Sequence, residues 1–278
     1  MMRVTVVVDN MVSISDKRAL RAEHGLSLLV EHEGQTILFD MGQSDVLLHN
    51  LSLLQIHPAD IDVLVISHGH YDHTGGLLPL LHHGGKKYPL YANDGIFAER
   101  HAVSGESRRF IGIPYTQEQL TNLGIAYRPS REPLEIAPNL WFSGQVPRQT
   151  EYELGDTRFV AACDGVTCPD CVDDDGSLYY ATSKGLIVIS GCAHAGLVNT
   201  VRYGMDVTGC HKLRGWIGGT HLGPAGTEQQ EKTLSALEEM EPEFIMANHC
   251  TGFLMLAELQ RRFGRRFIPG FAGTSIEC

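Results

Sequence analysis

The sequence predicts an α/β fold in one domain that spans residues 1–278. Short β-branched runs of strand length alternate with stretches in which apolar residues recur at helical spacing. Four of the strand-like runs lead directly into a histidine. No low-complexity segment or linker divides the chain, and 43% hydrophobic residues among 278 are ample for one core.

The first third of the chain is predicted to contain a strand, a hairpin, a helix and a buried strand, in that order. Residues 4–8 form a β-branched strand, and residues 25–31 and 36–39 form a hairpin that turns at Glu33-Gly34. Residues 44–55 carry apolar side chains at helical spacing, with Ser44 as the expected N-cap. Residues 61–66 then form an apolar strand that ends at Ser67-His68.

The rest of the chain repeats the pattern of a strand followed by a histidine. We expect a helix at 77–82, a strand at 89–91, a hairpin from 178–181 and 185–190, and strands at 214–219 and 244–247. An amphipathic helix covers 228–240. The stretch 105–147 is rich in glycine and proline and shows no clear element.

Charge and composition exclude several classes of partner. A formal charge of −11 repels a nucleic-acid backbone, and no apolar run approaches the roughly 20 residues that cross a bilayer. We therefore expect a small-molecule substrate, no nucleic acid and no membrane. The N-terminal residues lack a secretory cleavage pattern, so we expect a cytoplasmic protein whose seven cysteines serve as thiols or metal ligands.

One loop carries the chemistry. The run His68-Gly69-His70-Tyr71-Asp72-His73 gathers imidazoles and a carboxylate directly after a strand. Neutral imidazoles suit zinc, iron or manganese, and an added carboxylate favours a second, harder metal position. Two divalent metals, zinc first, can share and activate a water, whereas the alternative is a surface loop that is merely rich in histidine.

This loop resembles the signature of the metallo-β-lactamase fold superfamily, in which residues 37–42 resemble the preceding strand-Asp-x-Gly segment. Residues 144–148, 189–194, 218–222 and 248–252 resemble motifs of one branch. That branch contains metal-dependent hydrolases related to 7,8-dihydropterin-6-methyl-4-(β-D-ribofuranosyl)aminobenzene 5'-phosphate synthase. The resemblance implies an α/β (α+β) fold of the four-layer αββα sandwich type with the metals at one edge.

The resemblance also implies a ligand set. It assigns His68 and His70 to the first metal, Asp72 and His73 to the second, and His249 to the last histidine of the superfamily. Where the superfamily has a bridging Asp, this chain has Cys192, and His194 follows. Either the Cys192 thiolate bridges the metals or His194 ligates in its place, and we favour His194.

Further residues have roles that the sequence leaves open. His221 is a ligand, a general acid or a substrate donor, and it joins Asp72 as an expected catalytic residue. Asp40 is expected to brace a ligand imidazole. Arg148 and Lys184 are candidate cations for an anionic substrate, and a solvated surface role is the alternative.

The cysteines at 163, 168 and 171 suggest a separate site. Cys163, Cys168 and Cys171 have the C-x4-C-x2-C spacing of plant-type ferredoxins, which predicts a [2Fe-2S] cluster, a structural zinc or no ligand.

Three functions follow from these patterns. The first is hydrolysis of a small, anionic phosphate- or ester-bearing substrate by a metal-bridged hydroxide. The second is a condensation of the synthase type, and the third is an iron-sulfur or metal-binding redox sensor.

Overall fold

The fold is described from a computed structural model that covers residues 1–163 and 165–278. The chain forms two compact units. Unit 1 consists of Met1–Ser130, Thr157–Asp170 and Phe271–Cys278. Unit 2 consists of Arg131–Asp156 and Cys171–Gly270. The single domain expected over 1–278 stays a prediction, and each unit is described by itself.

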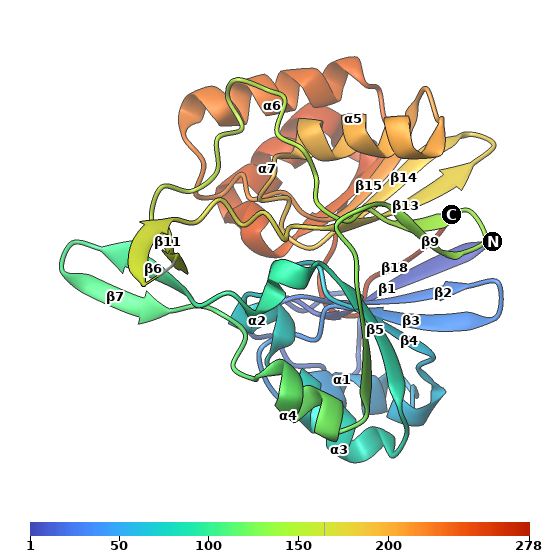
Figure 1. The fold of residues 1–278 in the computed structure, drawn as a ribbon. Coiled ribbons are helices and arrows are strands. Elements are labelled where there is room, and N and C mark those ends of the chain that lie inside the picture. Colours follow the sequence, from blue (N-terminus) through green and yellow to red (C-terminus); the bar gives the residue numbers. More distant parts are fainter. Residues whose placement is uncertain (164) are drawn as a thin grey trace. The chain divides into compact units, whose positions relative to one another are not determined.

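Unit 1 is built on a seven-stranded mixed sheet (Figure 1). Its strands, in spatial order, are β18 (Ser275–Glu277), β1 (Met2–Val8), β2 (Ser27–His32), β3 (Gln35–Phe39), β4 (Val63–Val65), β5 (Tyr88–Ala92) and β8 (Ile125–Pro129). The pairs from β18 to β3 are antiparallel, and those from β3 to β8 are parallel. The parallel strands therefore end at one common edge.

Helices cover one face of this sheet. They are α1 (Val46–Leu53), α3 (Leu77–Gly84) and α4 (Gln117–Asn122), with the short 3-10 helices η1 (Pro58–Asp60) and η2 (Asp94–Phe97) between strands (Figure 1). Leu47 and Leu51 of α1 and Leu80 of α3 pack into the same buried apolar cluster as the sheet residues Leu38 and Leu64. Burial of this shared face fixes the strand order that positions the histidine loop.

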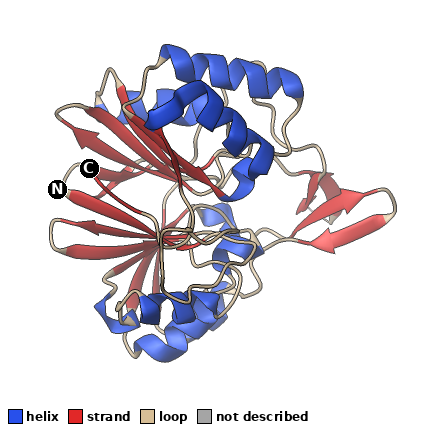
Figure 2. Ribbon diagram, turned by 180° about the vertical axis from the view of Figure 1, so that it is seen from behind, coloured by secondary structure: helices blue, strands red, loops and turns tan. Residues whose placement is uncertain are grey.

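A second, four-stranded sheet extends from unit 1 (Figure 2). Its strands are β12 (Val166–Pro169), β11 (Phe159–Cys163), β6 (Arg100–Ser104) and β7 (Ser107–Phe110), all antiparallel. It brings together two parts of the chain that lie more than fifty residues apart, since Phe159 pairs with Ala102.

Unit 2 has its own seven-stranded sheet. The order is β17 (Phe267–Pro269), β16 (Phe244–Asn248), β15 (Leu213–Gly219), β14 (Gly185–Ser190), β13 (Ser177–Thr182), β10 (Leu140–Phe142) and β9 (Leu134–Ala137). The strands from β14 to β17 are parallel. Helices α5 (Leu197–Thr208), α6 (Thr227–Glu239) and α7 (Gly252–Phe263) lie on one face of it (Figure 1), with 3-10 helices η3 (His249–Thr251) and η4 (Gly264–Arg266).

Most predicted elements are confirmed with shifted ends. Both predicted hairpins form, as β2 with β3 and β13 with β14. Helix α1 begins at Val46 after Asp45, so Ser44 is not the N-cap residue, although its hydroxyl accepts a hydrogen bond from the Val46 amide. Within the described residues, no helix combines the length and apolar content needed to cross a membrane.

Candidate metal centre

The histidine loop of unit 1 begins where β4 ends. Ser67 and His68 follow the buried strand, and the short helix α2 (Tyr71–Thr74) starts after His70. The residue between the two histidines is Gly69, and the backbone of Ile96 leaves no space for a side chain there. A Cβ at this position would lie 1.9 Å from the Ile96 carbonyl oxygen, so any side chain would push the loop away from η2.

The first two histidines direct ring nitrogens at one another. His68 Nε2 and His70 Nδ1 are 2.9 Å apart, and both side chains are buried. Two imidazole nitrogens that bind one tetrahedral zinc lie about 3.3 Å apart, because each Zn–N bond is about 2.0–2.1 Å. The pair therefore fits a shared metal ion with little movement of either ring.

The Asp40 carboxylate contacts both ends of this loop, at Ser67 and at His73. It follows β3, and its Oδ1 accepts a hydrogen bond from the Ser67 amide at 2.8 Å. Its Oδ2 accepts one from the Ser67 hydroxyl and lies 2.7 Å from His73 Nδ1. A carboxylate on Nδ1 fixes the tautomer that leaves Nε2 of His73 as the electron-pair donor, which is the form that binds metal.

Asp72 lies between two histidines, one of which the sequence analysis did not identify. Its Oδ2 is 3.9 Å from His73 Nε2 and 3.1 Å from His24 Nε2. His24 precedes β2, and the adjacent Leu26 amide donates to the Asp72 carbonyl at 3.2 Å. No local pattern marks His24, since only the pairing of distant segments brings it to the loop.

In unit 2 the predicted residues follow three neighbouring parallel strands. Ser190 of β14, Gly218 of β15 and Ala247 of β16 lie in register across the sheet. Cys192, His221 and His249 are each two or three residues beyond these positions and emerge at the same edge. The strand order therefore brings together residues that are up to 57 positions apart, from Cys192 to His249.

These strand ends have unusual backbone conformations. Ala193, His221 and His249 have positive φ angles of 57°, 50° and 51°, a region that costs energy for residues other than glycine. In unit 1, Asp40 at the end of β3 has a φ of 59°. Such strain persists where the surroundings hold the chain in place, and here it accompanies the residues expected to act in the site.

Two cysteines and a histidine form a cluster within unit 2. Ligand atoms of Cys192, His221 and Cys250 lie within 4.8 Å of one another, and the His221 amide donates to Cys250 Sγ at 3.2 Å. Cys250 was not assigned a role beside these residues from the sequence, although it adjoins His249 in one of the motifs. Thiolates and imidazoles are the donors that zinc prefers, so this set also suits a metal.

The pKa values of His221 and Cys250 are shifted in opposite directions, each partly by the other residue. Burial lowers the pKa of His221, but Asp156, 3.8 Å from its Nε2, and Cys250 outweigh burial and raise that pKa to about 9. Burial likewise raises the pKa of Cys250, but hydrogen bonds to Cys192 and His221 prevail and hold it well below its usual range. The charged forms of the Cys250 thiol and the His221 ring therefore stabilise each other.

His194 and the two candidate cations differ in their surroundings. The His194 ring lies 4.1 Å from the His221 ring, and the Arg148 guanidinium donates to the His194 carbonyl at 2.8 Å. Arg148 also donates to the Cys171 carbonyl, so its contacts brace two loops. Lys184 lies in the exposed turn before β14, roughly 26 Å along the strand from Cys192, and is not brought to the other residues.

Two of the three cysteines expected to form a separate site are joined to each other in the structure. Cys163 and Cys168 are joined in a disulfide, and Cys171 is an exposed thiol. Iron-sulfur clusters and structural zinc are held by thiolates, which a disulfide does not offer. Pairing of β11 with β12 brings two of the three sulfurs together, and a metal or cluster at these residues stays a prediction beside the alternative of no ligand.

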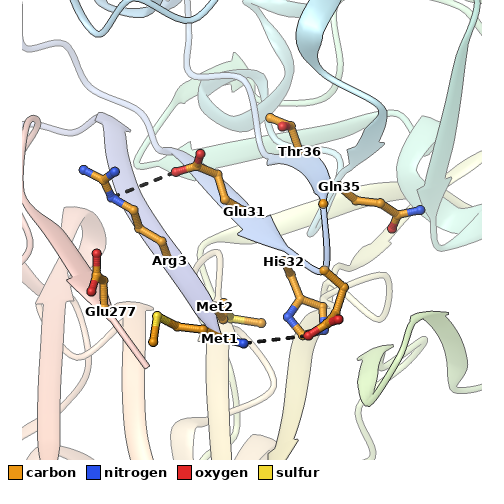
Figure 3. A pocket seen from close by; sticks show the side chains of 10 residues that line it. Met1, Met2, Arg3, Glu31, His32, Gln35, Thr36 and Glu277 are labelled. Carbon is orange, nitrogen blue, oxygen red and sulfur yellow. Dashed lines mark ion pairs between the residues drawn. The ribbon is translucent and has the colours of Figure 1, made fainter.

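A pocket at the other end of the unit 1 sheet lies outside the donor groups that the described residues form. It has a volume of about 360 Å³ and is lined by the ends of β1, β2 and β18 and the β2–β3 turn (Figure 3). Its charged groups pair with one another, Arg3 with Glu31 at 3.9 Å and the Met1 amino group with Glu33 at 3.7 Å (Figure 3). It lies at the far end of β2 from Leu26, which contacts Asp72.

Comparison with known proteins identifies the family. The family model described as the metallo-beta-lactamase superfamily matches residues 20–160, which include the whole histidine loop. The chain belongs to the metallo-beta-lactamase superfamily. This membership confirms the resemblance noted in the sequence.

Two relatives of this superfamily member come from Methanocaldococcus jannaschii. One is 7,8-dihydropterin-6-methyl-4-(beta-D-ribofuranosyl)-aminobenzene-5'-phosphate synthase, which is 32% identical over 265 residues, or 92% of this chain and 90% of the relative. The other is an uncharacterized protein, MJ0448, which is 30% identical over 273 residues, or 98% of this chain and 99% of the relative. Both similarities extend over almost the full length.

A crystal structure supports the same fold. Tm1679, a metal-dependent hydrolase of the beta-lactamase superfamily, is 27% identical and has a TM-score of 0.83 over 100% of this chain and 99% of its own. The predicted fold class, the αββα type of the metallo-β-lactamase superfamily, is thereby confirmed. Each unit contributes one mixed sheet and the helices that cover it.

Proposed function

We propose that this chain is a metal-dependent hydrolase with a dinuclear centre that acts on a small anionic substrate. The observation that carries the proposal is the pair of buried nitrogens, His68 Nε2 and His70 Nδ1, that converge to 2.9 Å in the superfamily's histidine loop. At this distance one ring can donate a hydrogen bond to the other, and a divalent cation would instead take both nitrogens as ligands.

The ligand set in this proposal is the one that the superfamily's pattern implies. Two divalent ions, zinc first and iron or manganese as alternatives, would be held by His68, His70, Asp72, His73, Cys192, His194 and His249. Within each unit the proposal is supported by the grouping of donors at strand ends.

The protein's own groups have separate tasks. When bound, the ions supply Lewis acidity and lower the pKa of water, so that a nucleophile is available at neutral pH. Asp40 keeps the His73 ring in the binding tautomer. His221, whose Nε2 lies 3.8 Å from the Asp156 carboxylate, would donate a proton to the leaving group, and Arg148 keeps the His194 loop in position.

The test uses variants that remove donors from the loop. In Asp72→Ala and His70→Ala we expect metal content to fall below two ions per chain, and kcat/KM for bis(p-nitrophenyl) phosphate to fall roughly 100-fold or more. Asp40→Asn should cost about 10- to 100-fold in metal affinity or activity. Elemental analysis and steady-state kinetics measure both quantities.

The matched controls are exposed residues of the same types in the same unit. Asp62→Ala and His83→Ala should leave metal content and rate unchanged, since both side chains are exposed. Full activity in Asp72→Ala and His70→Ala would disprove the mechanism.

A second candidate function follows from the relative that is a synthase. Its 32% identity over 92% of this chain supports a condensation of the synthase type. Formation of a covalent product that joins a pterin to a ribosyl-aminobenzene phosphate would identify this reaction, because hydrolysis joins no two molecules. Cytoplasmic residence and the absence of nucleic-acid partners stay predictions.

A further inference from the structure

Backbone contacts hold His24 beside the histidine loop. The Leu26 amide donates to the Asp72 carbonyl at 3.2 Å. A Cβ at Gly25 would lie 2.6 Å from the same carbonyl oxygen, so only glycine allows the two segments to come this close. Because both contacts directly follow His24, its ring extends from a backbone that is fixed against the loop.

The His24 ring reaches the Asp72 carboxylate. Its Nε2 lies 3.1 Å from Asp72 Oδ2, which is a hydrogen-bonding distance. The His24 side chain is 54% exposed, whereas that of Asp72 is only 9% exposed. Water therefore has little access to the carboxylate, and a hydrogen bond from a neighbouring side chain has a large share in setting its rotation.

Asn10, two residues after β1, determines which nitrogen of the ring carries the proton. The Gly25 amide lies 3.2 Å from Asn10 Oδ1, and since a backbone N–H can only donate, this atom is the acceptor oxygen. The other amide atom, Nδ2, therefore faces His24 Nδ1 at 3.3 Å. Nδ2 can only donate as well, so Nδ1 of the neutral ring accepts and Nε2 carries the proton.

The hydrogen bonds consequently run in one direction, from the Gly25 amide through Asn10 and His24 to Asp72. A protonated Nε2 offers no lone pair, so His24 in this tautomer donates to the carboxylate and does not act as an electron-pair donor. Its task thus differs from that of His73, in which Nε2 is the electron-pair donor.

We propose that His24 is a positioning residue, which as a hydrogen-bond donor fixes the Asp72 carboxylate in the rotation that binds a metal ion. The inference rests on the proposed function, in which Asp72 is a ligand. Carboxylates that bind metals are in turn held by hydrogen bonds from residues around them, and loss of such a partner weakens metal binding. Asn10 supports the same task by keeping the proton on His24 Nε2.

The test measures zinc binding by the full-length protein. Metal is removed with a chelator, and Zn(II) is titrated in competition with the chromophoric chelator 4-(2-pyridylazo)resorcinol, which gives a Kd for each ion. His24→Leu keeps the bulk but has no donor, and it should raise the Kd of the weaker ion roughly 10-fold. His24→Gln should stay within about threefold of the wild type, since its amide nitrogen can replace Nε2 as donor.

A double-mutant cycle tests the task of Asn10. Asn10→Ala should raise the same Kd about threefold in the wild type, because the proton of the ring is no longer confined to Nε2. In the His24→Leu background it should change Kd less than about 1.5-fold, since no imidazole remains to be held. Equal losses in the two backgrounds would show that the two residues act separately and would overturn the relay.

The matched control is His83→Leu, at an exposed histidine of the same unit, which should leave both Kd values unchanged. An unchanged Kd in His24→Leu would overturn the proposal. So would a His24→Gln protein that binds zinc as weakly as His24→Leu, because the imidazole itself would then be required. Since more than half of the His24 side chain is exposed, both metal-free variants should unfold thermally at the wild-type temperature.

The two proposals fail separately. If zinc affinity depends on His24 in this way but no ester is hydrolysed, the hydrolase proposal is wrong and the positioning role stands. If metal-dependent hydrolysis is observed but His24→Leu binds zinc normally, the positioning role is wrong and the hydrolase stands. A wild type that binds fewer than two zinc ions per chain would overturn both.

Discussion

Single buried carboxylates hold the loops of both units in place. Asp40 ties the Ser67 amide and hydroxyl to the His73 ring in unit 1. In unit 2, Glu153 accepts hydrogen bonds from the Val198 and Asn199 amides, the first groups of helix α5. A buried carboxylate at a helix N-terminus satisfies donors that the helix itself leaves without partners.

Replacing Glu153 should destabilise unit 2. In Glu153→Ala the Val198 and Asn199 amides lose their acceptors, and we expect the free energy of unfolding at about pH 5 to fall by about 1–3 kcal/mol. Urea unfolding followed by circular dichroism measures the change. Glu151→Ala, an exposed neighbour, is the control and should change stability by less than about 0.5 kcal/mol.

The pH dependence of this effect has a definite sign. Burial raises the pKa of Glu153, and the amide hydrogen bonds only partly oppose it. Its contribution to stability is therefore complete below the ordinary value of 4.5 and is lost as pH rises through the raised folded pKa. Wild type should lose stability relative to Glu153→Gln over this range, and a constant difference would contradict the assignment.

The sequence pattern predicted the candidate site residues that lie close together along the chain. It missed the residues that reach the site only through the fold. His68 to His73 form one loop after one strand, so their shared location followed from the sequence. His24 and Asp156 reach Asp72 and His221 from remote segments that have no recognisable pattern. A single sequence contains no signal for such pairings.

Strands that carry an alternating or β-branched pattern were predicted well, whereas the four-stranded sheet was not. Strands β1 to β5 and β13 to β16 follow short apolar runs. In β7 and β12 most side chains are exposed, so no apolar pattern distinguishes them from loops. Their pairing depends on Phe159 meeting Ala102, a contact between distant segments.

The β11–β12 hairpin contains the Cys163–Cys168 disulfide and is followed by the exposed thiol of Cys171. We expect iodoacetamide to label Cys171 in the native protein, because its thiol is exposed, and to leave Cys163 and Cys168 unlabelled until a reductant is added. Buried Cys192 should react only after unfolding and serves as the internal reference. Peptide mass spectrometry reads out each site, and acid-labile sulfide in the purified protein would contradict the prediction.

The last eight residues, Phe271–Cys278, complete unit 1, most of which comes from the first 130 residues of the chain. Residues 271–278 belong to unit 1, where β18 pairs with β1 and the Val6 amide donates to the Thr274 carbonyl at 2.9 Å. Further backbone hydrogen bonds join Ala272 to Met11 and Cys278 to Met2. Unit 1 is therefore discontinuous, and unit 2 is inserted between its parts.

Removing residues 271–278 should weaken unit 1. The lost backbone hydrogen bonds, at about 0.5–1.5 kcal/mol each, predict a fall of at least about 3 kcal/mol in the free energy of unfolding. Thermal and urea unfolding compare the truncated and full chains. Ser275→Ala removes only the hydroxyl contact with Thr5 and should cost less than about 1 kcal/mol. Equal stability of the truncated and full chains would show that β18 is dispensable.

The discontinuity has a consequence for synthesis on the ribosome. Sheet edge β1 emerges first, but its neighbour β18 emerges only after every residue of unit 2 has been made. Until then the amides and carbonyls of β1 that β18 will cover are open to other strands. A nascent chain is therefore most exposed to mispairing during the interval in which unit 2 is translated, and chaperones would have their longest opportunity to bind there.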